Sequence, residues 1–206
     1  MKRPLKPKDF RGWVVVAPFC YGYPDGWRQL ENKVAYHGYL RYLESVAEYL
    51  NQLQDYLEEG SSLTVLPCGG KIRGESEPSE ATMAVPVIQA LLTGQIPEFM
   101  LEEKSTNTEQ NVLNAILFVL RRHERMPIHL VFGCDNHRKL PVKVIAWYLC
   151  RWHGIKSWEV RSFKRRDNHP HSRLWWQLIR AIRCLVKPSL ILKRIGKEVQ
   201  SEATVA

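Results

Sequence analysis

The chain has 206 residues, of which 45% are hydrophobic, and its formal net charge is +9 at pH 7. This length and apolar content suit one domain of generous size, or a domain with an appendage, whose core forms without disulfides or metal. No stretch reaches the roughly 18–20 apolar residues that cross a bilayer, and no apolar signal segment follows the basic residues 1–8. We therefore expect a cytoplasmic protein, with association to a membrane surface as the alternative.

The positive charge is concentrated in one segment. Residues 161–197 hold 11 Lys/Arg and a single acidic residue, Asp167, whereas the rest of the chain has 19 Lys/Arg against 20 Asp/Glu. The basicity therefore belongs to a C-terminal segment and not to the body of the protein.

The cysteines indicate a reducing environment. They are odd in number, scattered, and form no CxxC pair: Cys20, Cys68, Cys134, Cys150 and Cys184. We expect reduced, mostly buried thiols, because neither a disulfide framework nor a metal-ligand spacing is present.

The first half of the chain alternates strand and helix patterns. Residues 12–19 are β-branched and aromatic, which is typical of a buried strand. Residues 31–59 have a helical composition without proline, and Gly60 follows as a natural end of a helix. A second strand is predicted over residues 62–67, and it runs into a glycine-rich loop at residues 68–78.

The next elements repeat the alternation. Ser79 is a predicted N-cap for a helix that reaches about Thr93, and Pro86 within it implies a kink or an early break. A third strand is predicted over residues 98–103, and a third helix opens at residues 105–108 and continues to about residue 123.

The last third ends in basic helices. A fourth apolar strand is predicted over residues 128–133, a helix over 139–153, and a weaker fifth strand over 156–163. Two basic helices are predicted near residues 172–187 and 190–200, separated around a proline.

Alternating helices and continuously apolar strands indicate an α/β fold. We expect a Rossmann-like three-layer domain over residues 1–165, with a mostly parallel sheet of about five strands, and a basic amphipathic helical extension over residues 166–206. Ligands of such sheets bind outside the carboxyl ends of the strands. That rule directs attention to four loops, at residues 20–27, 68–78, 104–108 and 134–138.

Three of these loops carry residue types that suit anions. Glycines let the backbone approach a ligand and point N–H groups at it, helix starts favour anions, and an arginine can clamp a phosphate or carboxylate through two parallel hydrogen bonds. The ligand-binding candidates are Gly69, Gly70, Ser79, Ser105, Asn107, Thr108, Asn111, Asp135, His137 and Arg138, and the catalytic candidates are Glu80 and Glu103.

Each candidate also has a purely structural interpretation. Ser79, Thr106 and Asn107 are good helix caps, the two glycines form an ordinary turn, and a lone histidine is more often structural than catalytic. The convergence of three polar loops of small residues on one edge favours a ligand site.

Four segments resemble a known family. Leu66–Gly70, Ser79–Met83, Gly94–Pro97 and Leu101–Asn111 follow the pattern of a strand ending in GG, then SEA, then G-x-P, then E-x-S-x-N-T-x-x-N. In order and spacing this resembles the YdcF/SanA/ElyC-like family, long catalogued as a domain of unknown function. The resemblance covers about residues 12–155, and Asp135–Arg138 looks like that family's later loop with His and Arg.

The resemblance implies a Rossmann-like sheet with the ligand site at these loops. Members are linked to binding of S-adenosylmethionine and to envelope and polyprenyl-linked glycan metabolism. Matching the motif carries site roles to Gly69, Gly70, Glu80, Glu103, Ser105, Asn107, Thr108, Asn111 and Arg138. The family's glycine-rich first turn is replaced here by the aromatic, proline-containing Ala17–Tyr23, which changes the ligand or closes the pocket.

Three functions fit these residues. The first is a hydrolase or transferase acting on a phosphate-containing substrate, with Glu80 or Glu103 as general base or as ligand of a divalent metal. The second is a binding module for S-adenosylmethionine or another nucleotide, in which the same carboxylates bond ribose hydroxyls without catalysis. The third is a peripheral membrane adaptor that uses the basic C-terminal helix.

Residues 173–187 are amphipathic on a helical wheel, with an apolar arc opposite Arg173, Arg180, Arg183 and Lys187. Such a helix docks on its own domain, lies on an anionic membrane, or attracts nucleic-acid phosphates. Because the sequence has no nucleic-acid motif, we expect no specific nucleic-acid partner.

Overall fold

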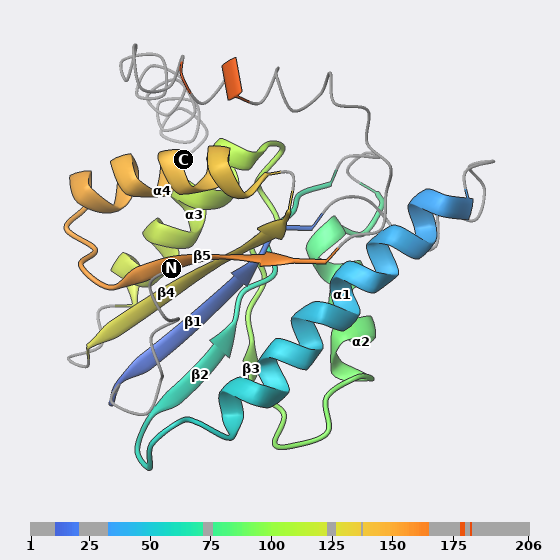
Figure 1. Ribbon diagram of the computed structural model, residues 1–206, viewed down its shortest axis with the longest axis horizontal. Helices are drawn as coiled ribbons and strands as arrows, with labels where there is room; N and C mark the ends of the chain where they lie inside the picture. Colours follow the sequence, from blue (N-terminus) through green and yellow to red (C-terminus); the bar gives the residue numbers. More distant parts are fainter. Residues whose placement is uncertain are drawn as a thin grey trace.

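The protein is described by a computed structural model, in which residues 11–20, 33–71, 76–122, 127–136 and 138–164, with 178, 179 and 182, are placed well enough to describe. The described residues form five strands and four helices in the predicted alternation (Figure 1). In chain order they are β1 (Trp13–Pro18), α1 (Lys33–Gln54), β2 (Ser62–Val65), α2 (Glu80–Gln89), β3 (Glu98–Phe99), α3 (Thr108–Arg121), β4 (Ile128–Asp135), α4 (Lys139–Trp152) and β5 (Trp158–Phe163).

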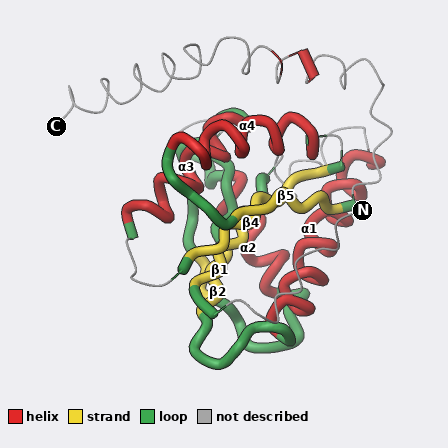
Figure 2. The backbone as a smooth tube through the Cα atoms, turned by 60° about the vertical axis from the view of Figure 1, so that its left-hand side comes forward, coloured by secondary structure: helices red, strands yellow, loops and turns green. Residues whose placement is uncertain are grey.

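The strands form one parallel sheet with the order β3-β2-β1-β4-β5. α1 and α2 cover one face of this sheet, and α3 and α4 cover the other (Figures 1 and 2). The prediction of a Rossmann-like α/β domain with a parallel sheet is confirmed. The chain leaves the sheet in opposite directions from β1 and β4, which are neighbours, and open α/β sheets commonly bind ligands at such a switch point.

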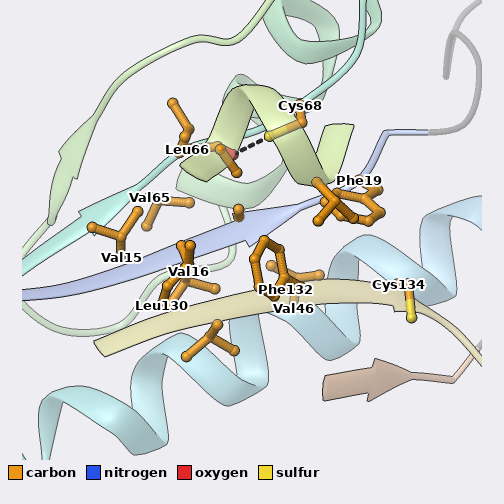
Figure 3. Packing of buried hydrophobic residues seen from close by; sticks show 14 of the residues in the cluster. Val15, Val16, Phe19, Val46, Val65, Leu66, Cys68, Leu130, Phe132 and Cys134 are labelled. Carbon is orange, nitrogen blue, oxygen red and sulfur yellow. Dashed lines mark hydrogen bonds between the residues drawn. The ribbon is translucent and has the colours of Figure 1, made fainter. Parts of the chain in front are cut away.

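β1 is the centre of the core because it has a strand on each side and a helix layer on each face. All six of its residues are buried, as its run of β-branched side chains predicts. Figure 3 shows Val15 and Val16 packed among side chains from neighbouring strands, including Val65 of β2 and Leu130 of β4. Burying each such side chain contributes about 1.5–3 kcal/mol, so the central strands fix the position of the loops at their ends.

Several predicted boundaries were wrong. α1 ends at Gln54 and not near residue 59, and Gly60 instead lies in the turn before β2 with a φ of +84°. α2 contains Pro86 and continues past it to Gln89, so it ends a few residues before the predicted Thr93 and is not broken at the proline.

Two strands also differ in length from their predictions. β3 has two residues where six were predicted, since only Glu98 and Phe99 pair with β2 before the chain bends. β4 continues to Asp135, two residues further than predicted, because β5 pairs with it along that length.

The predicted basic helices near residues 172–187 and 190–200 lie outside the described residues, apart from Leu178, Ile179 and Ile182. In the described part of the chain, none of the helices combines the length and the hydropathy that crossing a bilayer requires. Four of the five cysteines fall in this part, and all four are free and buried, as expected: Cys20, Cys68, Cys134 and Cys150.

Candidate functional site

The ends of β1 and β2 and the segment after β3 continue as a backbone ladder beyond the regular sheet. Cys68 pairs in parallel with Phe19 on one side and with Glu102 on the other, and the N–H of Cys20 donates to the carbonyl of Cys68 at 2.8 Å. The loops that follow these strands are therefore held side by side, as the sequence predicts.

The two glycines of this edge use their amides within the protein. Gly69 N–H donates to the carbonyl of Glu102 at 2.9 Å, and Gly70 N–H donates to the carbonyl of Ser105 at 2.7 Å. The carbonyls of both glycines accept the first two amides of α2, each at 3.1 Å. The amides therefore join the loops to one another, which differs from the predicted arrangement in which they point at a ligand.

Close approach explains why both positions are glycine. A Cβ on Gly69 would lie 2.9 Å from Cβ of Cys20 and 3.0 Å from Oε2 of Glu80, and a Cβ on Gly70 would lie 2.6 Å from the carbonyl oxygen of Ser105. Distances below 3 Å do not occur at real Cβ atoms without displacement. The glycine pair thus brings α2 and the segment after β3 into direct contact.

The start of α2 is closed by a carboxylate from the next loop. Ser79 caps the helix by accepting from Thr82 N–H at 3.0 Å, and the Ser79 and Thr82 hydroxyls each donate to Oε1 of Glu103 at 2.7 Å. These hydrogen bonds, from Ser79 first and then Thr82, hold the pKa of Glu103 below its ordinary value. Glu103 is therefore an ionised group fixed at the positive end of α2.

The neighbouring Glu102 points the other way and is buried, with 8% of its surface exposed. Its Oε1 accepts from Lys104 N–H at 2.9 Å, Ser105 N–H at 3.1 Å and Asn114 Nδ2 at 2.9 Å. Its other oxygen, Oε2, has no hydrogen-bond partner among the described residues, although it is inaccessible to solvent. Such an atom calls for an explanation, because buried polar groups are normally paired.

Asn111 presents a second such atom. It lies in the first turn of α3 with 5% of its surface exposed, and its Oδ1 is buried without a hydrogen-bond partner in the described structure. Its backbone N–H donates to the carbonyl of Asn107, which itself caps α3 by accepting from Gln110 N–H at 2.9 Å.

Asn114 connects these groups. It lies on the face of α3 that carries Asn111, one turn further along, and its Nδ2 donates to Glu102 and to Ser105 Oγ at 3.1 Å. Ser105 is 1% exposed. We call Glu102, Ser105, Asn111 and Asn114 the acceptor cluster. Three of its members are buried and Asn114 is half-buried, and the cluster lies where the segment after β3 meets α3.

Glu80 is the second buried carboxylate of this edge, with 8% of its surface exposed. Burial first, and then the charge of Glu80, raises the pKa of the Cys20 thiol well above its ordinary value, and Glu102 adds to this effect. Burial and Glu102 act in the same direction on Cys68. Both thiols therefore stay protonated and are poor nucleophiles.

The end of β4 has a different character. Asp135 is buried, and its Oδ1 accepts from Arg138 N–H at 2.9 Å, while Arg138 Nε lies 3.8 Å from Oδ2. Arg138 occupies the N-cap position of α4, where no side chain caps the helix, and the first turn has no acidic residue. Because β1 lies between β2 and β4, these two strands are two strand spacings, about 10 Å, apart across the sheet.

The structure thus brings together most of the predicted residues. Around the ends of β2 and β3 it gathers Gly69, Gly70, Ser79, Glu80, Glu103, Ser105, Asn107, Thr108 and Asn111. Asp135 and Arg138 stand apart at β4, and His137 lies outside the described residues. Glu102 and Asn114 were missed, and for Glu102 the alternation of side chains along a strand was the available signal, since neighbours point to opposite faces.

No metal site is formed by three or more His, Cys, Asp or Glu side chains in the described part of the chain. Comparison with protein-family models, with curated proteins and with solved structures finds no match for this chain. The resemblance to the YdcF/SanA/ElyC-like family therefore stays a prediction.

Proposed function

We propose that this domain binds a small phosphate- or nucleotide-like ligand at the carboxyl ends of its strands, and that the ligand donates hydrogen bonds to the acceptor cluster. The observation that carries the proposal is the pair of buried oxygens without partners, Glu102 Oε2 and Asn111 Oδ1. They lie on one edge of an open parallel sheet, which is where such folds bind ligands.

The chemistry of the two oxygens defines the complementary group. Leaving a buried acceptor without a donor costs about 1–3 kcal/mol, and more when the acceptor is charged. A hydroxyl or amine of a ligand would remove that cost in the complex. Sugar hydroxyls are suitable, and a carboxylate near a strand end commonly bonds the ribose of a nucleotide.

The start of α4 supports the phosphate part of the proposal. This helix N-terminus carries Arg138 and Lys139, and its two basic residues outnumber the one carboxylate beside them, that of Asp135, so it attracts an anion. The segment that carries Glu102 pairs with β2 on the side away from β1, so three strand spacings, about 14 Å, separate it from β4 across the sheet. A ligand that bonds at both places must therefore be extended, with a sugar at one end and a phosphate at the other. S-adenosylmethionine is the alternative, because it also carries a ribose.

The geometry favours binding over hydrolase or transferase chemistry at Glu103. A general base works best when its pKa lies near the working pH, and the hydrogen bonds from Ser79 and Thr82 lower the pKa of Glu103. If the domain is an enzyme acting on a phosphate-containing substrate, Glu80 is the better candidate for the base, because its carboxylate is buried beside Gly69, whereas two hydroxyl hydrogen bonds hold the carboxylate of Glu103. The family resemblance is the basis for placing such a substrate in envelope glycan or polyprenyl metabolism.

The test is thermal unfolding in the presence of a compound panel. The panel contains S-adenosylmethionine, nucleotides, nucleotide-sugars, pyrophosphate and short polyprenyl phosphates, each with and without a divalent metal. A compound at 100 times its dissociation constant adds about 2.7 kcal/mol of stability, which raises the Tm of a domain of this size by several degrees.

Glu102→Gln is the informative variant. It keeps Oε1 as an acceptor for Lys104, Ser105 and Asn114 but replaces Oε2 with an NH₂ group, which cannot accept a hydrogen bond. The matched control is Glu58→Gln, an exposed residue in the segment before β2. We expect a Tm shift in the wild type and the control that Glu102→Gln loses. A panel without any shift, or an equal shift in all three proteins, contradicts the proposal.

Catalysis is tested separately. Each compound that raises the Tm is incubated with the protein, and products are sought by mass spectrometry. Turnover that Glu80→Gln abolishes while binding is retained assigns the base, whereas binding without any product assigns a binding module.

A further inference from the structure

The outward face of α4 carries large apolar side chains in contact with solvent. Leu140, Trp147 and Trp152 are 53%, 49% and 62% exposed in the described structure. The opposite face of α4 is already used, because it packs on β4, β5 and α3 with Val142, Ile145 and Leu149 buried among others. The exposed residues are therefore a second surface of this helix and not a part of the core.

The aromatic rings on this face are ordered by contacts with their neighbours. Tyr148 and Trp152 stack with ring centroids 6.4 Å apart, and the guanidinium of Arg151 lies over the ring of Trp147 at 5.9 Å. The two tryptophans are thus held in place at the surface, and neither ring turns inward to bury itself.

The charges on the same helix have one sign. Lys139, Lys143 and Arg151 are exposed, and the helix sequence KLPVKVIAWYLCRW contains no acidic residue. Basic side chains therefore flank the exposed apolar ones. Residues 161–197, which hold 11 Lys/Arg and one acidic residue, follow shortly afterwards in the chain.

We propose that the outward face of α4, defined by Lys139, Leu140, Lys143, Trp147, Arg151 and Trp152, binds the surface of an anionic lipid bilayer. Tryptophan rings favour the boundary between headgroups and acyl chains, and basic side chains extend beside them to anionic headgroups. This combination of exposed Trp and Leu with basic residues is typical of helices that lie in the plane of a membrane surface. A nucleic acid fits this surface less well, because its phosphates would bind the basic side chains but would not bury the exposed leucine.

This surface is distinct from the ligand site and from the amphipathic segment at residues 173–187. The surface belongs to a helix that is part of the folded domain, so the geometry of this surface does not depend on contact with a membrane. α4 starts at the carboxyl edge of the sheet, after Arg138, and the helix runs away from that edge (Figure 2).

The experiment is flotation of the full-length protein with lipid vesicles. One set contains phosphatidylcholine alone, and the other contains phosphatidylcholine with a third of phosphatidylglycerol. Trp147→Ala/Trp152→Ala is compared with the matched control Tyr56→Ala/Leu91→Ala, which removes two exposed apolar side chains elsewhere on the domain. Circular dichroism establishes that each variant is folded.

We expect the wild type and the control to float with the anionic vesicles, and the tryptophan variant to lose on the order of tenfold in partition coefficient. Lys143→Gln/Arg151→Gln should lose about 25-fold, about fivefold for each basic side chain, and raising the salt concentration should weaken wild-type binding.

Three results would overturn the proposal. The first is equal flotation of the wild type and both α4 variants, which would assign any binding to the C-terminal segment. The second is wild-type binding that does not distinguish anionic from neutral vesicles. The third is binding of a short RNA that the α4 variants lose while vesicle binding is unchanged, which would assign the face to nucleic acid.

Discussion

The two halves of the carboxyl edge of the sheet differ in how the chain is held after each strand ends. Around β2 and β3, the loops pack so closely that glycines are required, and the loop amides bond to loop carbonyls. At β4, the helix that follows starts without a side-chain cap and with basic residues. The first half therefore presents buried carboxylate and amide oxygens, whereas the second presents basic residues beside one buried carboxylate, that of Asp135.

This difference shows that a polar, glycine-rich loop at a strand end is not by itself an anion site. Gly69 and Gly70 have the freedom to point N–H groups at a phosphate, yet both amides are used within the protein. What the β2–β3 half offers a ligand is acceptors, and what the β4 half offers is donors. Each of the following variants changes one feature of the β2–β3 half and leaves the β4 half unchanged.

The largest expected effect is that of Gly70→Ala. The added Cβ would meet the backbone carbonyls of Ser105 and Glu103 at 2.6 and 2.9 Å, so the two loops must separate. We expect a loss of about 3 kcal/mol in the free energy of unfolding, at the upper end for overpacking, measured by urea denaturation. Gly94→Ala is the control, because its Cβ meets only the end of the Gln54 side chain. Equal stability of the two variants would mean that the glycine pair is an ordinary turn.

A smaller loss is expected from Glu102→Ala. It leaves the Lys104 and Ser105 amides and the Asn114 side chain without their acceptor, which costs about 2 kcal/mol. Glu102→Gln keeps that acceptor and removes a buried charge whose Oε2 is unpaired, so without ligand it should be as stable as the wild type or more stable. Calorimetry of the two variants decides this. Strong destabilisation by Glu102→Gln would mean that the carboxylate is structural.

Ser79→Ala should lower the free energy of unfolding by about 1 kcal/mol, the usual cost of a lost N-cap. Ser79 also donates to Glu103, so the variant should raise the pKa of that carboxyl toward its ordinary value. The stability is measured by urea denaturation, and Thr82→Val, which removes only the other hydroxyl bonded to Glu103, is the comparison. A loss smaller for Ser79→Ala than for Thr82→Val would contradict its assignment as the cap.

The smallest expected effect is the pH dependence that Glu103 gives to the free energy of unfolding. The folded-state pKa of Glu103 is lowered by Ser79 and Thr82, so its contribution is present above the unfolded-state pKa, near 4.5, and is lost as pH falls through the lower folded-state value. Because the carboxylate is largely exposed, the contribution should be below about 1 kcal/mol. Wild type and Glu103→Gln should therefore differ at pH 7 and converge as the pH falls through the lowered folded-state pKa of Glu103. A difference that is constant over this range would assign it to packing and not to charge.

The sequence predicts the architecture well because its strands are unambiguous. The β-branched run at Trp13–Pro18 and the apolar run in β4 can only be buried strands, and the helix starts at Ser79 and Asn107 carry good capping residues. Less was predictable at the edge of the sheet, where the length of β3 depends on how many residues pair with β2 and not on propensity.

The candidate site was predicted in outline but not in detail. Sequence patterns placed Ser105, Asn107 and Asn111 at one helix start, and the structure places them there. They selected Glu103 and missed Glu102, because the pairing of Glu102 with Cys68 determines which carboxylate is buried. Sequence patterns also could not show that the amides of Gly69 and Gly70 are hydrogen-bonded within the protein, since their acceptors are distant in the chain.

A crystal structure of the protein with the panel compound that gives the largest Tm shift tests the central claim most directly. The account predicts a hydroxyl or amine of the compound within about 3 Å of Glu102 Oε2 and of Asn111 Oδ1, with any phosphate toward the start of α4. A compound bound on a helix face, or one at the strand ends that leaves both oxygens unpaired, would contradict it.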